Sequence, residues 1–438
     1  MKAKLPYAAM VLALAVITGA QAQPPAGGPV PVTADNFPRA ESDLYFSGVV
    51  KNGGFGKFDH TREPAPLDKQ TVIRLNRDTL YSAAVFDLDA GSVTITLPDA
   101  GKRFMSLQVI DEDQYTHGVY YGGGGHELTR EGIGTRYVLT AVRTLVDPTD
   151  PKDLEEVHAL QDAIKVRQQS PGRFEVPNWD LVSQKKVREA LLVLASTLPD
   201  TKRMFGSKDR VDPVRFLIGA ASAWGGNPEQ EALYLNIVPT KNDGTTIYKL
   251  NVKDVPVDGF WSVSVYNAEG YYQQNQYNAY SLNSITAKKD KDGAVTVQFG
   301  GCDGKVVNCL PTMKGWNYMV RLYRPHAEIL DGKWTFPIAQ EVISPDETAM
   351  LLGRGRDMLK LGDMPAARLL LRRAAEAGNS EAAFMLASTF DPIVIREVGV
   401  IGVAPDLNEA LAWYEKASAL GSEEAKRRIE RLGHAGNR

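Results

Sequence analysis

The densest cluster of polar side chains in the sequence lies between two apolar segments and consists of Asn76, Arg77, Asp78, Thr79 and Tyr81. The planar guanidinium of Arg77 can hold a carboxylate or a phosphate, and Asp78 and Tyr81 can act as acid and base or as hydrogen-bonding groups. On a strand, Asn76 and Asp78 would face away from the other three, so a common pocket requires a turn. The alternative is structural: an Arg77 to Asp78 ion pair with Asx-turn hydrogen bonds would fix a corner between strands. Both interpretations stay open.

A second polar group combines aromatic rings with amides. Aromatic faces supply contact area and amides supply directional hydrogen bonds, so the group suits sugars and other neutral polar ligands. Its members are Tyr266, Tyr271, Tyr272, Gln274, Asn275, Tyr277, Asn278 and Tyr280. The alternative is a β-sandwich core with a polar edge loop, and we assign the neighbouring Trp261 to such a core. Our candidate ligand-binding residues are Asn76, Arg77, Tyr266, Asn275 and Tyr280; Asp78 and Tyr81 are the candidate catalytic residues.

The sequence carries no GxSxG, HExxH, CxxC or dinucleotide-binding motif, which disfavours the commonest hydrolases and dehydrogenases. His117 and His126 are weak metal candidates, because imidazole with nearby carboxylates suits zinc or iron. They flank a glycine loop at a spacing that fixes no ligand geometry. We therefore predict neither a metal nor a cofactor.

The first residues have the order of a secretory signal peptide. Lys2 and Lys4 precede an apolar run from Tyr7 to Ile17, and small residues lead to a cleavage site between Ala22 and Gln23. The apolar run is shorter than the roughly 20 residues that cross a bilayer, which disfavours an anchor. We predict a signal peptide over 1–22, a Pro/Gly-rich linker over 23–34, and a periplasmic or secreted protein that is not transmembrane after processing.

Two cysteines, Cys302 and Cys309, flank a glycine-containing loop. In an oxidising compartment such a pair predicts a local disulfide; a redox pair or half a metal site is the alternative.

The composition indicates a modular globular protein. A chain of 438 residues corresponds to about three domains, and 43% hydrophobic with 24% charged residues excludes wholesale disorder and a polytopic membrane protein. The net charge of -3 offers no basic field for nucleic acid.

Hydrophobic periodicity divides the chain into four parts. We predict a β-sandwich over 35–148, in which 93–97 and 105–109 alternate as a β-hairpin, and a helical subdomain over 149–226 with helix starts at Asp150, Asp180 and Asp212. Short strands return over 227–342 as a second sandwich or jelly roll. Residues 343–438 are helical, and one pattern recurs with Gly378 and Gly421 in equivalent places, which is typical of an α-solenoid.

Several motifs support this division by resemblance. The first β part resembles the domain-of-unknown-function family numbered 1254, through Asn76 to Ser82, Asn36 to Asp43 and Phe86 to Leu88. The second resembles its usual companion, family 1214, through Gly259 to Ser262, Tyr266 with Asn267, Asn275, Tyr280 to Asn283, Leu310 with Pro311, Arg321 to Pro325 and Leu330 to Trp334. Leu411 to Ala417 resembles a helix of a Sel-1-like repeat, a relative of the tetratricopeptide class. These resemblances imply a multidomain, mainly β protein: an immunoglobulin-like β-sandwich, a helical insertion, a jelly-roll-like β-sandwich and C-terminal α-helical repeats.

The expected function is that of an exported envelope protein. We expect the two β domains to bind a small polar molecule between them, and the repeats, which are too few to stand alone, to dock on the β region or on a protein partner. The alternative is a hydrolase or lyase of the envelope that uses Asp78 and Tyr81, with Arg77 as anion anchor. A homo-oligomer is compatible with either interpretation.

Overall fold

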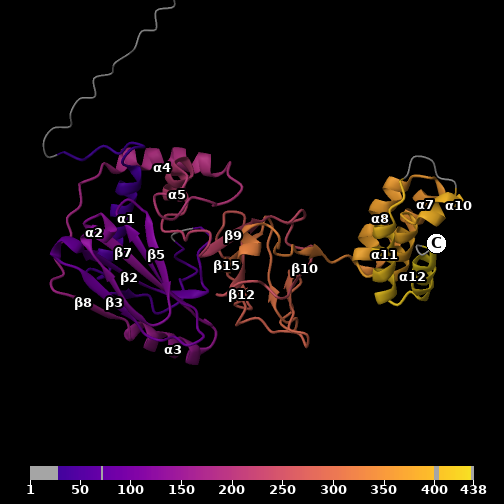
Figure 1. Cartoon of the computed structure of the whole chain (residues 1–438), viewed down its shortest axis with the longest axis horizontal. Helices are drawn as coiled ribbons and strands as arrows, with labels where there is room; N and C mark the ends of the chain where they lie inside the picture. Colours follow the sequence, from indigo (N-terminus) through magenta and orange to yellow (C-terminus); the bar gives the residue numbers. More distant parts are fainter. Residues whose placement is uncertain (1–27, 71–72, 399–403, 436–438) are drawn as a thin grey trace, which may run out of the picture.

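The computed structural model describes residues 28–70, 73–398 and 404–435. The predicted signal peptide, its cleavage site at Ala22 and Gln23, and residues 23–27 of the predicted linker lie outside the described residues. Two β-rich units follow one another and a helical tail ends the chain (Figure 1), so the prediction of a mainly β protein with C-terminal helical repeats is confirmed. In the described ranges, no helix has both the length and the apolar character needed to cross a membrane.

The first unit contains two sheets that share one hydrophobic core. Leu107 and Val142 of the larger sheet pack against Val93, Ile95 and Leu97 of the smaller one. The larger sheet has the strand order β1 (Asp59–His60), β2 (Thr79–Asp87), β7 (Tyr137–Leu145), β4 (Met105–Asp111) and β5 (Thr116–Tyr121). The smaller sheet has the order β6 (Gly124–Leu128), β3 (Val93–Leu97) and β8 (Lys165–Gln168). An immunoglobulin-like topology for these sheets stays a prediction.

The predicted hairpin of 93–97 with 105–109 is wrong in its pairing. Both segments are strands, but β3 pairs with β6 and β8, whereas β4 pairs with β5 and β7. Each strand turns alternate residues toward the same core from opposite sides. Alternation shows which residues of a strand face the core, but it does not show with which strand it pairs. A hairpin and two strands from opposite sheets therefore produce the same sequence pattern.

Three helices cover one side of the first unit: α1 (Phe37–Lys51), α4 (Leu181–Ala195) and α5 (Pro213–Ser222). We expected only strands after Asp35, so α1 is a correction. Its Phe37 and Ala40 pack against Leu191 of α4 and Ile218 of α5, and this tertiary packing decides its helical state. The short elements η1 (Leu88–Ala90) and α2 (Arg130–Ile133) lie in connections of the same unit.

The three predicted helix starts are found where expected. Asp150, Asp180 and Asp212 each accept hydrogen bonds from backbone N–H groups of the first turn of α3 (Pro151–Asp162), α4 and α5. The predicted subdomain of 149–226 nevertheless contributes β8 to the smaller sheet, and Val157 of α3 packs against Leu80 of β2. This segment is therefore part of the first unit's packing; its boundaries as a domain stay a prediction.

The carboxyl of Asp43 on α1 gives a pH-dependent prediction. Burial raises its pKa to about 6, partly opposed by the hydrogen bond from Trp179 Nε1, 2.8 Å from Oδ2. Because the folded state holds this proton more tightly than the unfolded chain, the associated stability is complete below about pH 4 and is lost as the pH rises toward about 6. In the wild type we expect the unfolding free energy to fall by roughly 2 to 3 kcal/mol over that interval because of this group. In Asp43→Asn this fall should be absent, and urea denaturation at each pH measures it. A pH profile identical to that of the wild type would contradict this assignment; exposed Asp35→Asn is the control.

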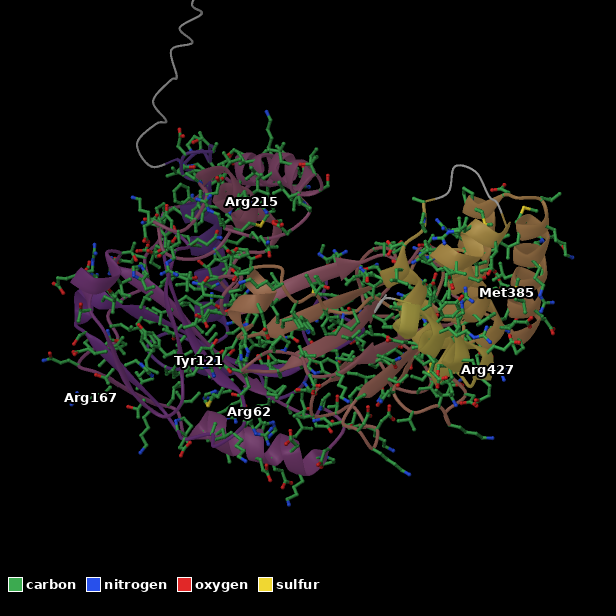
Figure 2. All side chains as sticks on the ribbon, turned by 45° about the vertical axis from the view of Figure 1, so that its right-hand side comes forward. Arg62, Tyr121, Arg167, Arg215, Met385 and Arg427 are labelled. Carbon is green, nitrogen blue, oxygen red and sulfur yellow. A yellow bond between two sulfur atoms is a disulfide. The ribbon has the colours of Figure 1, made fainter. Side chains whose placement is uncertain are left out.

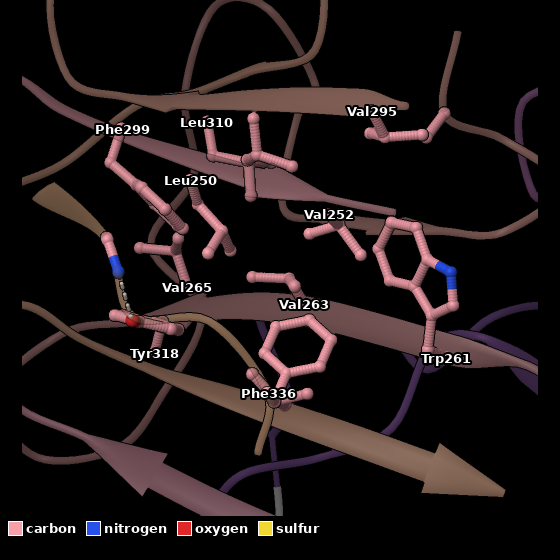
Figure 3. Close-up of a cluster of buried hydrophobic side chains, with 14 of the residues drawn as sticks. Leu250, Val252, Trp261, Val263, Val265, Val295, Phe299, Leu310, Tyr318 and Phe336 are labelled. Atoms are coloured by element: carbon pink, nitrogen blue, oxygen red, sulfur yellow. Dashed lines mark hydrogen bonds between the residues drawn. The ribbon is translucent and has the colours of Figure 1, made fainter. Parts of the chain in front are cut away.

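The second unit also places two sheets around one core. Val263, Val265, Phe299 and Leu310 fill it together with Trp261 (Figure 3), which confirms Trp261 as a core residue. One sheet has the order β14 (Cys309–Leu310), β13 (Val295–Phe299), β10 (Tyr248–Val252) and β16 (Gln340–Glu341). The other has the order β12 (Ser281–Asn283), β11 (Trp261–Tyr266), β15 (Asn317–Tyr323) and β9 (Ala232–Ile237). The short helix α6 (Ala327–Leu330) follows β15, and the jelly-roll assignment stays a prediction.

The predicted disulfide between Cys302 and Cys309 is confirmed. It closes a short loop that leads into β14, with a sequence separation of 7. We expect Cys302→Ser with Cys309→Ser to lower the unfolding free energy by about 2 to 3 kcal/mol, because the open loop gains conformational freedom in the unfolded chain. Chemical denaturation checks this value, and wild-type protein treated with reductant should lose the same amount. A loss confined to the serine variant would indicate damage to packing instead.

The helical tail has a core of its own. Its helices are α7 (Pro345–Lys360), α8 (Met364–Glu376), α9 (Ser380–Ser388), α10 (Pro392–Val398), α11 (Leu407–Ala419) and α12 (Glu423–Ala435). Buried alanines allow these helices to approach closely, and Arg428 of α12 pairs with the buried Asp391 before α10. In Figure 1 the tail stands beside the second unit. It is joined to that unit through the chain before Pro345 and through an ion pair between Arg373 of α8 and Glu341 of β16.

Candidate functional site

The predicted polar motif lies where the first β unit meets the second. Asn76 Oδ1 accepts a hydrogen bond from the backbone N–H of Asp78 at 2.9 Å, which is the Asx turn of the structural alternative. Its Nδ2 lies 3.2 Å from Tyr81 Oη in the first unit and 3.2 Å from Tyr323 Oη on β15 of the second. Asn76 therefore links the two units directly.

The predicted ion pair between Arg77 and Asp78 is not formed among the described residues. The Arg77 guanidinium donates to the carbonyl of Ala65 and lies 5.6 Å from the centre of the Tyr280 ring. Burial lowers its pKa. The two adjacent side chains have different partners: Arg77 contacts Ala65 and Tyr280, whereas Asp78 contacts Asn283. Arg77 therefore links its loop to the second unit.

Asp78 is enclosed at the junction, with 1% of its surface exposed. Its Oδ1 accepts a hydrogen bond from Asn283 Nδ2 at 3.2 Å. Burial raises the pKa of this carboxyl, while the nearby charge of Arg321 and the surrounding hydrogen bonds act in the opposite direction. An enclosed carboxyl of this kind can hold a proton, but it has no direct access to a substrate in solution.

Arg321 and Tyr266 of the second unit hold the loop that precedes the motif. Arg321 is 2% exposed; its Nη1 donates to Ser264 Oγ at 2.9 Å, and its Nη2 donates to the carbonyl of Arg74 and to Tyr266 Oη, both at 2.8 Å. Tyr266 Oη in turn donates to the carbonyl of Leu75 at 2.8 Å. Tyr266, predicted to bind ligand, is thus fully buried between the units.

Tyr81 has a cationic neighbour that the sequence analysis missed. The Arg143 guanidinium on β7 lies 5.4 Å from the centre of the Tyr81 ring and donates through Nη1 to Gln108 Oε1 at 2.7 Å. Burial raises the pKa of Tyr81, but the charge of Arg143 and the hydrogen bond from Asn76 outweigh it, and the net shift is downward. No local sequence signal relates Arg143 to Tyr81; only the pairing of β2 with β7 brings them together.

The other predicted ligand-binding residues shape a loop of the second unit. Asn275 Oδ1 accepts hydrogen bonds from the backbone N–H groups of Tyr277 and Ala279, and its Nδ2 donates to the carbonyl of Ala279 at 2.8 Å. Tyr280 is buried and packs with Tyr266 and Tyr272. The aromatic and amide groups therefore form a buried cluster and a self-bonded loop, as in the core-and-loop alternative.

The two candidate metal ligands lie in different sheets. His117 is on β5 with its Nε2 2.8 Å from Asp111 Oδ2, whereas His126 is on β6 and packs against the Tyr120 ring. Within the described ranges, no group of three or more His, Cys, Asp or Glu side chains is placed to hold a metal ion.

An open pocket of about 360 Å³ lies at the edge of the junction. Val119 and Tyr121 of β5 line one side of it. Tyr121 is labelled on the first unit in Figure 2. The second unit supplies the rest: Gln230, Glu231, Asp258, Arg324 and Pro325. A second hollow of about 310 Å³, beside Phe55 and Pro171, lies within the first unit alone.

Charged side chains converge at the junction pocket. Tyr121 Oη donates to Glu231 Oε2 at 2.7 Å, and the Arg324 guanidinium lies 4.6 Å from the centre of the Tyr121 ring. Burial, followed by the bond to Glu231, raises the pKa of Tyr121, so its hydroxyl remains a donor. Asp258 lies 3.5 Å from Arg324 and 2.8 Å from His326.

The pocket adjoins the predicted motif without containing it. Tyr121 packs edge-on against Phe104, which contacts Phe260 and Tyr323, and Tyr323 bonds Asn76. The pocket residues were not predictable from local patterns, because they come from β5 of the first unit and from chain segments next to strands of the second. The one available signal was the charged Arg324 directly before Pro325.

Three protein families match separate segments of the chain. Residues 55–132 match the family described as Protein of unknown function (DUF1254), and residues 238–327 match Protein of unknown function (DUF1214). Residues 347–379 and 380–422 each match the Sel1 repeat. No curated protein matches the chain.

Two solved structures resemble the chain. The VPA0106 protein from Vibrio parahaemolyticus is 19% identical with a TM-score of 0.55, covering 71% of this chain and 98% of that chain. An uncharacterized protein from Burkholderia cenocepacia is 12% identical with a TM-score of 0.41, covering 70% of this chain and 87% of that chain. The first likeness shows a shared fold. The chain thus carries, in this order, DUF1254 and DUF1214 segments followed by two Sel1 repeats, as its motifs predicted.

Proposed function

We propose that the chain is an exported envelope protein whose two β units together bind a small polar molecule, and whose Sel1 repeats engage a protein partner. The observation that carries the ligand proposal is the junction pocket, because both units line it and charged groups of both signs converge there. Ligand sites occur preferentially where domains meet. The proposed site is therefore beside the predicted motif, and the motif holds the two units in register.

The enzyme alternative has one observation in its favour. The pKa of Asp78 is raised and that of Tyr81 is lowered, and shifts toward neutral pH suit groups that act as acid or base. Against it, neither residue lines the open pocket, and Asp78 is almost fully enclosed. Catalysis by this pair would require the β units to separate, so binding is the function that we favour.

Native mass spectrometry of protein purified from its own cell envelope tests the ligand proposal. We expect a small molecule to co-purify and to be lost in Val119→Trp, whose indole fills the pocket, but retained in Lys57→Trp, which places the same indole beside the second hollow. Deletion of 345–438 should leave the small molecule bound and release any protein partner. Equal retention of the small molecule in Val119→Trp would contradict the junction pocket as its site.

A further inference from the structure

Three charged side chains line the junction pocket, and Glu231 differs from Asp258 and Arg324 in having no partner of opposite charge among the described residues. Glu231 accepts a hydrogen bond from the Tyr121 hydroxyl, which is neutral, and no basic side chain of the described residues lies within salt-bridge distance of its carboxylate. A half-buried carboxylate without a cation favours a positively charged ligand group. Glu231 therefore offers a site for an ammonium group.

Arg324 offers the complementary site. Its contact with Asp258, at 3.5 Å, joins two solvent-accessible side chains, and Asp258 is shared with His326. Exposed pairs of this kind contribute little, so a ligand carboxylate can replace Asp258 on the guanidinium. The planar guanidinium presents further N–H donors in the fork geometry that carboxylates fit.

The backbone holds Arg324 toward the pocket. Its φ of 53° lies in the left-handed region, which costs a residue with a side chain about 1 kcal/mol. Two hydrogen bonds maintain it: the Arg324 N–H donates to the carbonyl of Glu231 at 2.9 Å, and the Asp258 N–H donates to the carbonyl of Arg324 at 3.0 Å. These bonds join all three charged segments of the pocket, so strain is maintained where the charged groups converge.

We propose that the junction pocket binds a small molecule carrying both an ammonium and a carboxylate group, with the ammonium at Glu231 and the carboxylate at Arg324. This inference depends on the proposed function, because it assigns a ligand class to the same pocket. Tyr121 lines the pocket beside both groups, because its hydroxyl donates to Glu231 and its ring lies under the Arg324 guanidinium.

Calorimetric titration of the full chain with matched compounds tests the ligand class. The panel contains α-amino and ω-amino acids of two to six carbons. Each amino acid is matched with three compounds of the same carbon skeleton: one that lacks the ammonium, one that lacks the carboxylate, and an uncharged alcohol that lacks both. We expect the best amino acid to lose affinity by about tenfold or more when either charged group is removed.

Variants identify which residue binds which group of the ligand. In Glu231→Gln, a ligand that lacks the ammonium should bind as tightly as the amino acid. In Arg324→Gln, a ligand that lacks the carboxylate should bind as tightly as the amino acid. Arg167→Gln, a change at an exposed arginine of the first unit, should bind as the wild type does. Thermal melting of each variant confirms that it is folded.

Two results would overturn the inference. If a neutral or singly charged compound binds as tightly as the amino acids, and Val119→Trp abolishes that binding, the ligand class is wrong while the proposed pocket stands. If no compound of the panel binds in a way that Val119→Trp abolishes, the ligand class is also wrong. The proposed pocket is tested separately, by native mass spectrometry of the molecule that co-purifies from the envelope with the wild type and with Val119→Trp.

Discussion

Replacement of Arg321 by methionine is expected to lower the unfolding free energy by about 3 to 5 kcal/mol. The guanidinium is almost fully buried and donates to Ser264, Tyr266 and the carbonyl of Arg74. Methionine fills much of the volume but cannot donate to these groups, and it removes the positive charge that lowers the pKa of Asp78. Urea denaturation followed by tryptophan fluorescence measures the loss.

The response of this variant to pH separates the electrostatic role of Arg321 from packing. The folded-state pKa of Asp78 is raised, so its contribution to stability is complete below its unfolded pKa and is lost as the pH rises through the folded value. Because Arg321 opposes that rise in pKa, Arg321→Met should extend the loss to higher pH, and adding Asp78→Asn should recover part of the stability. Arg167→Met at the surface should change stability by less than about 0.5 kcal/mol. A similarly small effect of Arg321→Met would contradict its assigned role.

Replacement of Phe260 by alanine is expected to cost about 3 to 5 kcal/mol, because it opens a cavity in the apolar seam between the β units. The Phe260 ring is 1% exposed, stacks on Tyr323 at 4.2 Å between ring centres and contacts Phe104 of the first unit edge-on at 5.1 Å. The same denaturation measurement gives the loss for each single variant.

A double-mutant cycle shows whether this seam couples the units. Phe104→Ala with Phe260→Ala should cost less than the two single changes together, by about 0.5 to 1.5 kcal/mol, the value of an aromatic pair beyond its buried area. Phe58→Ala is the matched control, since Phe58 packs in the core of the first unit and should add independently to Phe260→Ala. Additive effects of Phe104 and Phe260 would show that the seam does not couple the units.

Local sequence patterns predicted elements better than they predicted neighbours. The alternation in 93–97 and 105–109 correctly identified two strands and the apolar residues that they turn to the core, although Ser106 and Gln108 on the other face of β4 are buried as well. Aspartates correctly marked three helix starts. The pairing of β3 and β4 was wrong because two strands that face one core from opposite sheets have the same alternation as a hairpin. The helix α1 was missed because its burial against α4 and α5 depends on residues far along the chain.

The candidate site was located only in part for a similar reason. Asn76 and Tyr81 do lie at the contact between the units, but the residues that give them their environment are distant: Asn76 and Tyr323 are separated by 247 positions. The turn at Asn76 was predictable, because an asparagine that bonds the N–H two residues ahead is a local feature. Arg321 gave one usable signal, because it is the single charged residue of its strand and follows the apolar Met319 and Val320, and a buried charge requires partners.

The most direct test of the account is a crystal structure of the full chain grown with the tightest-binding compound from its envelope or from the amino acid panel. We predict ligand density against Tyr121, with polar contacts of roughly 2.6 to 3.2 Å to Glu231 and Arg324. The hydrogen bonds of Asn76 and Arg321 should be unchanged. Density at Asp78 between separated β units would contradict the account and favour the enzyme alternative. Density beside Phe55 or on the helical tail would place the ligand site outside the junction altogether.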